Sequence, residues 1–229
     1  MKRLVALLCL VGLCLLPVAA QNEPEYRLEL GAGAGLTAYT GDFNGDVMRG
    51  MQPLGEVVAK YKMNPRMALG AALGISQLKG SSTNADTWYP GLAVTPVDFK
   101  TSLIDFNVRY EYNFWPFGTG EEYRGAQPLT PFIAIGMGLS FAKPEGQTTK
   151  TGFQVPIGLG VKYKLAQRWN LAAEWMIHFT GSDQLDGVSD PYGIKSSGLF
   201  KNTDCYGVAA VTLTYDLWEK CKTCNNDRD

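Results

Sequence analysis

The feature that most constrains the fold is a pair of alternating segments in residues 153–179, FQVPIGLGVKYKLAQRWNLAAEWMIHF. Apolar side chains take every second position, beginning at Phe153 in the first segment and at Trp169 in the second. Because successive side chains of a strand point to opposite faces, each segment has one apolar face and one mixed polar face. Aromatic residues stand at the ends of the apolar face, as in the interfacial girdles of transmembrane barrels. The pattern predicts a membrane-spanning β-hairpin with a tight turn at residues 166–168.

The N-terminus has the composition of a cleaved secretory signal peptide. Two basic residues near its start precede an apolar run that ends at Leu16, and small residues follow up to Ala20. The apolar run is too short for a membrane anchor, which takes roughly 17 to 25 residues. A lipoprotein signal at Cys14 is disfavoured because Leu13 is larger than the small residue that such cleavage requires. We expect residues 1–20 to be removed.

The same period of two recurs along the rest of the chain. Its sharpest example is SLIDFNVRYEYNFWPF at residues 102–117, where a charged or amide residue takes every second position up to Asn113. A cation near the bilayer midplane costs roughly 2 to 4 kcal/mol on the lipid-facing side, so these residues must face an interior. Similar segments begin near residues 26, 54, 67, 129 and 205. Together with the hairpin they predict an all-β fold, an eight-stranded antiparallel up-and-down transmembrane β-barrel of outer-membrane type over residues 21–218.

The connections between these strands predict the orientation of the barrel. An even number of strands brings both ends of the closed sheet to one side, which in outer-membrane barrels is the periplasmic side, and outer loops are longer than periplasmic turns. The predicted outer loops are residues 41–52, 79–101, 142–152 and 181–204, and the predicted periplasmic turns are residues 64–66, 115–129 and 165–168. The connection at 115–129 is longer than a turn requires. Residues 219–229 form a periplasmic tail, so both termini are expected in the periplasm.

Charged residues on the inward faces predict how the lumen is filled. An eight-stranded barrel has an interior that side chains can occupy, without a wide aqueous channel. Buried charges persist only where they are paired, so we expect a network of ion pairs rather than an ion path. Glu111 and Glu174 could serve as catalytic carboxylates, but paired structural charges perturb pKa values equally well. The predicted network consists of Arg27, Glu29, Glu56, Lys60, Lys62, Asp105, Arg109, Glu111, Lys162, Lys164 and Glu174.

Few residues of the sequence suit catalysis or metal binding. His178 is the only histidine and falls on an inward face, so a plain lumen residue is favoured over a general base. The sequence has no GxSxG, HExxH or EF-hand motif. An outer-membrane lipase or protease is the enzyme alternative, but we expect no enzyme, no cofactor and no metal. The formal net charge of -1, with no basic run interleaved with aromatic residues, argues against nucleic acid as a partner.

The cysteines suggest a covalent contact at the C-terminus. Cleavage of the signal peptide leaves Cys205, Cys221 and Cys224. An odd number of cysteines in an oxidising compartment leaves at least one thiol free or paired with another molecule. The Cys221-Lys222-Thr223-Cys224 motif has no second pair and no thioredoxin-like context. Because Cys205 falls at the opposite end of the barrel, we expect a local disulfide in the tail or an intermolecular disulfide through Cys221 or Cys224.

Several segments resemble one family of bacterial membrane proteins. They are LGAGAGLTAYTGDFN, KYKMNPRMALGAALG, RYEYNFWPF, TPFIAIGMGLSFA and QVPIGLGVKYKLAQRWNLAAEW. In this order they are similar to the PorG family, the small outer-membrane barrel of the type IX secretion system of Bacteroidetes. The resemblance covers nearly the whole mature chain, and its most specific part is GVKYK followed by RWNL and EW. Where the family carries an acidic DYLDDVS-like loop, this chain has SDQLDGVSDPY, which puts any function of that loop in doubt.

The resemblance implies a scaffolding role in protein secretion. Such barrels associate with a periplasmic ring built from the lipoprotein PorK and the protein PorN, which helps to export proteins with C-terminal sorting domains. We place the expected ring contact in the over-long periplasmic connection and the tail, at Glu121, Glu122, Tyr123, Arg124, Cys221 and Cys224. Outer-membrane lipid is the other expected partner. The alternative is an OmpA-like structural or adhesive barrel that acts through its outer loops.

Overall fold

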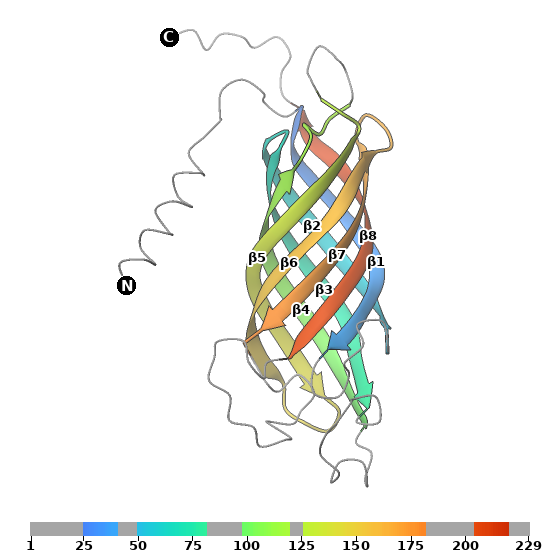
Figure 1. Ribbon diagram of the computed structural model, residues 1–229, viewed down its shortest axis with the longest axis vertical. Helices are drawn as coiled ribbons and strands as arrows, with labels where there is room; N and C mark the ends of the chain where they lie inside the picture. Colours follow the sequence, from blue (N-terminus) through green and yellow to red (C-terminus); the bar gives the residue numbers. More distant parts are fainter. Residues whose placement is uncertain (1–24, 41–49, 82–97, 120–125, 182–203, 220–229) are drawn as a thin grey trace, which may run out of the picture.

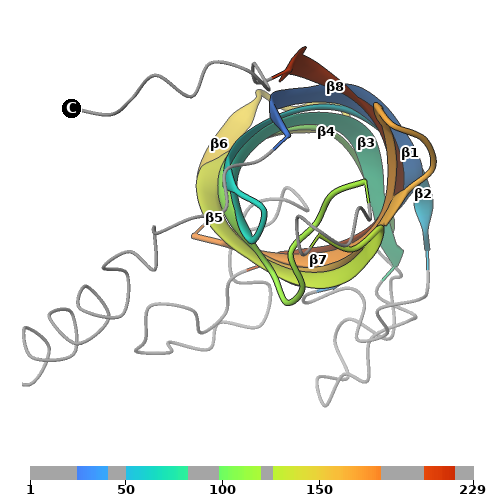
Figure 2. The same ribbon diagram turned by 90° about the horizontal axis from the view of Figure 1, so that it is seen from above.

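The alternating segments form a closed β-barrel. The computed structural model describes residues 25–40, 50–81, 98–119, 126–181 and 204–219. Each strand pairs antiparallel with its neighbours in the chain, and β1 pairs with β8 to close the sheet (Figures 1 and 2). This confirms the predicted eight-stranded antiparallel barrel. The strands are β1 (Tyr26–Thr40), β2 (Gln52–Asn64), β3 (Met67–Ser81), β4 (Asp98–Asn113), β5 (Leu129–Pro144), β6 (Lys150–Lys164), β7 (Trp169–Thr180) and β8 (Cys205–Glu219).

The two ends of the barrel differ in their connections. We call the end at which β1 begins and β8 ends the turn end, because the short β2–β3 and β6–β7 turns also lie there (upper end of Figure 1). In the first of these turns the Asn64 side chain accepts a hydrogen bond from the Arg66 amide at 2.8 Å, an arrangement typical of Asx turns. In the second turn the Trp169 amide donates to the Ala166 carbonyl at 3.2 Å. The opposite end is called the loop end.

Large apolar side chains cover the outer surface of the barrel. Ile75 is 62 % exposed, Met137 63 % and Leu159 57 %. A band of this extent would be unfavourable in water and is typical of a lipid-facing barrel surface. In the hairpin of residues 153–179, Phe153 is exposed while its neighbour Gln154 is buried, as the alternation predicts. Within the described ranges there is no helix long and apolar enough to span a membrane.

The strands extend further towards the loop end than the sequence predicts. Residues 79–101 were expected to be a loop, but β3 continues to Ser81 and β4 begins at Asp98. The predicted loop at 142–152 is shorter as well, because β5 ends at Pro144 and β6 begins at Lys150. Strand pairing needs only backbone groups, so it continues beyond the lipid-facing band, where neither face must be apolar and the period of two fades.

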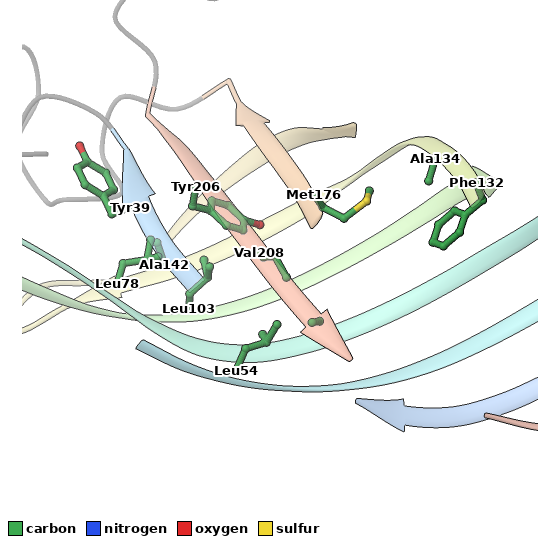
Figure 3. Packing of buried hydrophobic residues seen from close by; sticks show 11 residues of the cluster. Tyr39, Leu54, Leu78, Leu103, Phe132, Ala134, Ala142, Met176, Tyr206 and Val208 are labelled. Atoms are coloured by element: carbon green, nitrogen blue, oxygen red, sulfur yellow. The ribbon is translucent and has the colours of Figure 1, made fainter. Parts of the chain in front are cut away.

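Apolar side chains occupy the interior towards the loop end. Figure 3 shows Tyr39, Leu78, Leu103 and Tyr206 projecting into the same space from different strands, with Phe132 set apart from them. The ring of Phe99 packs edge-to-face on Tyr39, with 4.8 Å between the ring centroids. Figure 2 shows the barrel end-on and the sheet closed around this interior. The remainder of the interior is polar and is described next.

Candidate functional site

A first group of charges lies in the lumen at the turn end and centres on Asp216. Lys62 Nζ lies 2.6 Å from one oxygen of this carboxylate, and the ammonium group of Lys164 pairs with the other. The amide of Asn170 donates to Asp216 at 3.0 Å. Lys62 also reaches Glu29 at 3.3 Å. Two cations and two anions therefore balance one another across four strands of the barrel.

A second group of charges lies deeper in the lumen and centres on Glu111. Its carboxylate contacts Lys162 at 2.6 Å, Lys60 at 3.1 Å and the Nε atom of Arg109 at 3.2 Å. Arg109 in turn forms a two-pronged pair with Glu174, at 2.8 and 3.0 Å. Because Glu111 is fully buried and Arg109 is 2 % exposed, these ions depend on one another for compensation.

Phe132 separates the two lysines of this second group. The Nζ atom of Lys162 lies 4.6 Å from the centre of its ring and that of Lys60 lies 5.8 Å away. Gly160 faces Phe132 in the register of β5 and β6, and a Cβ atom at Gly160 would stand 2.6 Å from the ring. The missing side chain thus gives the aromatic ring its space. An aromatic ring against two cations stabilises both through its negative face.

Asp105 and Glu56 also face the lumen, and neither forms an ion pair with another described residue. Asp105 accepts a hydrogen bond from the Asn107 amide at 3.2 Å. Glu56 is 9 % exposed, and its Oε1 atom has no hydrogen-bond partner among the described residues. In that part of the chain, no group of three or more histidine, cysteine or acidic side chains is arranged to hold a metal ion. The lumen is built as a packed polar interior.

Arg27 is a correction to the predicted network. It was expected to face the lumen, but it is exposed, whereas Tyr26 beside it is 3 % exposed. The alternation reverses at this end of β1, opposite Trp218, whose φ of 57° departs from strand geometry. The irregular backbone near the end of β8 therefore accompanies the outward orientation of Arg27. The other charged residues of the predicted network all lie inside the barrel.

Asp216 is the lumen residue that the sequence analysis missed. It lies between the outward Tyr215 and Leu217 of β8, and the same alternation that places Glu111 inside also places Asp216 inside. The signal was therefore present in the sequence. When Asp216 is added to the predicted network and Arg27 is taken out of it, each lysine of the turn-end group has an anionic partner.

His178 faces the interior of the barrel, as predicted. Its Nδ1 atom lies 2.6 Å from the Gln154 side-chain oxygen, and its ring stacks on Tyr206 with 4.5 Å between the ring centroids. The Tyr206 hydroxyl donates to the same Gln154 oxygen at 2.5 Å. These contacts fix the imidazole ring within the packed interior, which is the position of a structural residue.

The connection between β4 and β5 folds back across the turn end. β4 ends at Asn113, close to the start of the predicted turn at 115–129, and the Phe117 side chain is 7 % exposed at the mouth of the barrel. The Phe117 amide donates to the Pro65 carbonyl at 2.9 Å, and its ring lies 5.7 Å from Lys62 Nζ and 5.8 Å from Lys164 Nζ. Figure 2 shows this connection crossing the mouth of the barrel. We call the described parts of the connection, residues 114–119 and 126–128, the turn-end cap.

Hydrogen bonds hold the turn-end cap on both sides. The Gly118 amide donates to the Gln127 carbonyl at 3.0 Å, which joins the two parts of the cap. The Thr119 hydroxyl donates to Glu25 at 2.7 Å. The backbone of Trp115 both donates to and accepts from the hydroxyl of Thr130, at 3.0 and 3.1 Å. The cap is therefore a defined surface, fixed to the barrel at several points.

The residues predicted to contact a partner lie outside the described part of the chain. These are Glu121, Glu122, Tyr123, Arg124, Cys221 and Cys224. The described residues on either side of the first four belong to the turn-end cap, and β8 reaches Glu219 at the same end. Cys205 begins β8 at the loop end, opposite the end of β8 from which the tail continues.

Comparison with solved structures gives the same architecture. Neisserial surface protein A matches with a TM-score of 0.52 and 13 % identity, covering 83 % of this chain and 97 % of its own. The N-terminal barrel of OprF from Pseudomonas aeruginosa gives 0.44 and 12 %, covering 85 % and 99 %. Ail from Yersinia pestis, solved with the heparin analogue sucrose octasulfate, gives 0.46 and 10 %, covering 85 % and 99 %. Identities this low concern the fold alone.

Sequence comparison identifies the family. No curated protein matches the chain. The family model described as "Outer membrane protein beta-barrel domain" matches residues 5–199, which is most of the sequence. The closed barrel, its lipid-facing band and its charged interior fit that description. The chain belongs to the outer membrane protein beta-barrel domain family.

Proposed function

We propose that this barrel anchors the periplasmic ring of the type IX secretion system, formed by PorK and PorN, to the outer membrane. In this proposal the turn end and both termini face the periplasm. The barrel contributes a surface and supports the export of proteins with C-terminal sorting domains. The type IX assignment draws on the resemblance of GVKYK, RWNL and EW to the PorG family.

The observation that carries the proposal is the turn-end cap. A barrel that only spans the membrane needs a tight turn between β4 and β5, like the one between β6 and β7 at residues 165–168. Here the connection instead covers the mouth and inserts Phe117 over the lysines of the turn-end charge group. Such a cap, fixed to the barrel at several points, suits a docking surface.

The filled lumen also favours a role through surfaces. Ion pairs centred on Asp216 and Glu111 and the packed apolar side chains occupy the interior. A secreted protein cannot pass through an eight-stranded barrel filled in this way. The barrel therefore acts as an anchor beside the export route.

Co-purification from membranes tests the proposal. We would isolate the tagged barrel from its native outer membrane and quantify PorK and PorN by mass spectrometry. Alanine at Glu121, Glu122, Tyr123 and Arg124 should reduce ring recovery about tenfold, since losing a few central interface contacts costs roughly 1 to 2 kcal/mol or more. Alanine at the exposed loop-end residues Lys143, Glu145, Gln147 and Thr148 is the matched control and should leave ring recovery unchanged.

A second pair of variants tests the tail. Serine at both Cys221 and Cys224 should remove any reductant-sensitive complex band, whereas serine at Cys205 should not. Unchanged recovery of the ring with the alanine and serine variants would refute the contact surface. Recovery of host or matrix ligands in place of the ring would favour the OmpA-like adhesive alternative. Circular dichroism of each variant establishes that the barrel has folded.

A further inference from the structure

The outer surface of the barrel carries an apolar groove across β4, β5, β6 and β7. It has a volume of about 560 Å³. Its two walls are rows of outward side chains at paired register positions, one row running from Tyr112 to Trp175 and the other from Tyr110 to Ile177. The floor between the rows lies at Ala134 and Gly158, the register pair that separates the two rows.

The groove is inclined within the membrane-spanning wall. Tyr112 directly precedes the last residue of β4 at the turn end, whereas Trp175 lies halfway along β7. The groove crosses three interstrand spacings of about 4.8 Å each, or about 14 Å. One leaflet contributes about 15 Å to a hydrocarbon core of about 30 Å. The groove therefore has the length and the position of one acyl chain of the leaflet at the turn end.

A cationic side chain lies at the foot of the groove. Met67 pairs with Tyr112 in the β3–β4 register, and the exposed Arg66 precedes Met67. Arg66 donates from Nη1 to the Phe114 carbonyl at 2.6 Å, which holds its guanidinium group beside the end of β4. Phe114 is 47 % exposed and packs edge-to-face on Tyr112, as in an interfacial aromatic belt. Guanidinium has five N–H donors, so one bond to a carbonyl leaves several for an anion.

We propose that this groove is a binding site for one phospholipid, with an acyl chain between the two rows and the phosphate on Arg66. Arginine suits phosphate because its planar fork offers two parallel charge-assisted hydrogen bonds. The apolar groove matches the acyl chain, and the cation at its foot matches the phosphate. The two lie in the order in which they occur in a phospholipid. The proposal rests on the turn end facing the periplasm, as proposed above, because the periplasmic leaflet of an outer membrane consists of phospholipid.

Native mass spectrometry tests the site. The purified full chain in detergent is titrated with palmitoyl-oleoyl phosphatidylethanolamine, and the fraction of protein carrying one lipid is measured. Ile157→Trp fills the groove, and Ile104→Trp, at an outward position of β4 outside the groove, is its matched control. Arg66→Gln removes the phosphate contact, and Arg27→Gln removes an exposed cation elsewhere at the turn end.

We expect a single-lipid species in the parent protein and in both controls. Ile157→Trp, which occupies the groove, and Arg66→Gln, which removes the charge-assisted contact to the phosphate, should each weaken it about tenfold. Equal weakening by Ile104→Trp and Arg27→Gln, or lipid numbers without a single-lipid step, would overturn the site. If the protein retained lipopolysaccharide in preference to phosphatidylethanolamine, the turn end would not face the periplasm. That result would overturn the ring proposal as well. Arg66→Gln needs no repacking, so it keeps the test valid if Ile157→Trp does not fold.

Discussion

At the scale of single residues, Glu111 holds the buried charges of the lumen together. Its carboxylate compensates Lys60, Lys162 and Arg109. Glu111→Gln would remove the ion-pair partner of Lys60 and Lys162 and leave Arg109 paired with Glu174, and breaking a buried pair in this way costs about 3 to 5 kcal/mol. Equilibrium unfolding in urea, with the protein in lipid vesicles, would measure the loss of unfolding free energy.

The exposed pair between Arg168 and Glu219 provides the control for this prediction. Its atoms lie 3.0 Å apart, but the two side chains are 42 % and 40 % exposed. Solvent screens such pairs, and Glu219→Gln should change the unfolding free energy by about 0 to 1 kcal/mol. Equal effects of the two glutamine variants would show that the network around Glu111 contributes no more than a surface contact.

Gly160 gives a second prediction at the residue scale. A Cβ atom at this position would stand 2.5 Å from the Ala173 carbonyl oxygen and 2.6 Å from the Phe132 ring, so Gly160→Ala forces both the neighbouring backbone and the ring to shift. Overpacking of this kind costs about 1 to 3 kcal/mol. Gly55→Ala is the matched control, because a Cβ atom there meets nothing within 4 Å. The two unfolding midpoints, compared under the same conditions, decide whether the space at Gly160 is required.

At the scale of elements, Phe117 decides whether the turn-end cap remains fixed to the barrel. Phe117→Ala removes a side chain that is 7 % exposed and that packs over Lys62 and Lys164, so the cap should detach while the strands stay paired. Amide hydrogen exchange should rise at least about tenfold for Gly118 and Gln127, because their amides donate to the Gln127 and Pro116 carbonyls within the cap and these bonds depend on local stability.

Phe114→Ala is the control for the cap. Phe114 belongs to the same connection but is 47 % exposed, so its loss should leave the exchange of Gly118 and Gln127 near the parent rate. Faster exchange in β5 as well as in the cap of Phe117→Ala would instead mean that the cap and the barrel unfold as one unit.

The elements also show what a sequence can and cannot predict. The outward positions of β6 and β7 follow from their alternation, because lipid on one side and a packed lumen on the other enforce a period of two. The same rule fails for Arg27, which lies opposite the irregular backbone at Trp218 of β8, and at Lys79 to Ser81 and Lys150, where strands extend without an apolar face. The fold of the turn-end cap escaped prediction because Phe117 reaches the lysines through tertiary packing.

At the scale of the whole molecule, the filled interior predicts a barrel that does not conduct. Planar bilayer recordings of the reconstituted protein should show no discrete conductance steps, since the lumen is crossed by the ion pairs of Asp216 and Glu111. A porin in the same bilayer serves as the positive control. Reproducible steps from the folded protein would show that the interior opens.

The charge group around Asp216 also constrains how the chain can assemble. It joins Glu29 of β1 and Lys62 of β2 to Lys164 of β6 and Asp216 of β8, so its members come from both ends of the sequence. Contacts of such high sequence separation form late and make folding slow. An open sheet that lacks β8 would leave Lys164 without its partner Asp216 and Lys62 with Glu29 alone, and a poorly compensated cation in the membrane is costly. Because β8 supplies Asp216 to both lysines, we expect insertion of the strands into the membrane and closure of the barrel to occur together, in one cooperative step.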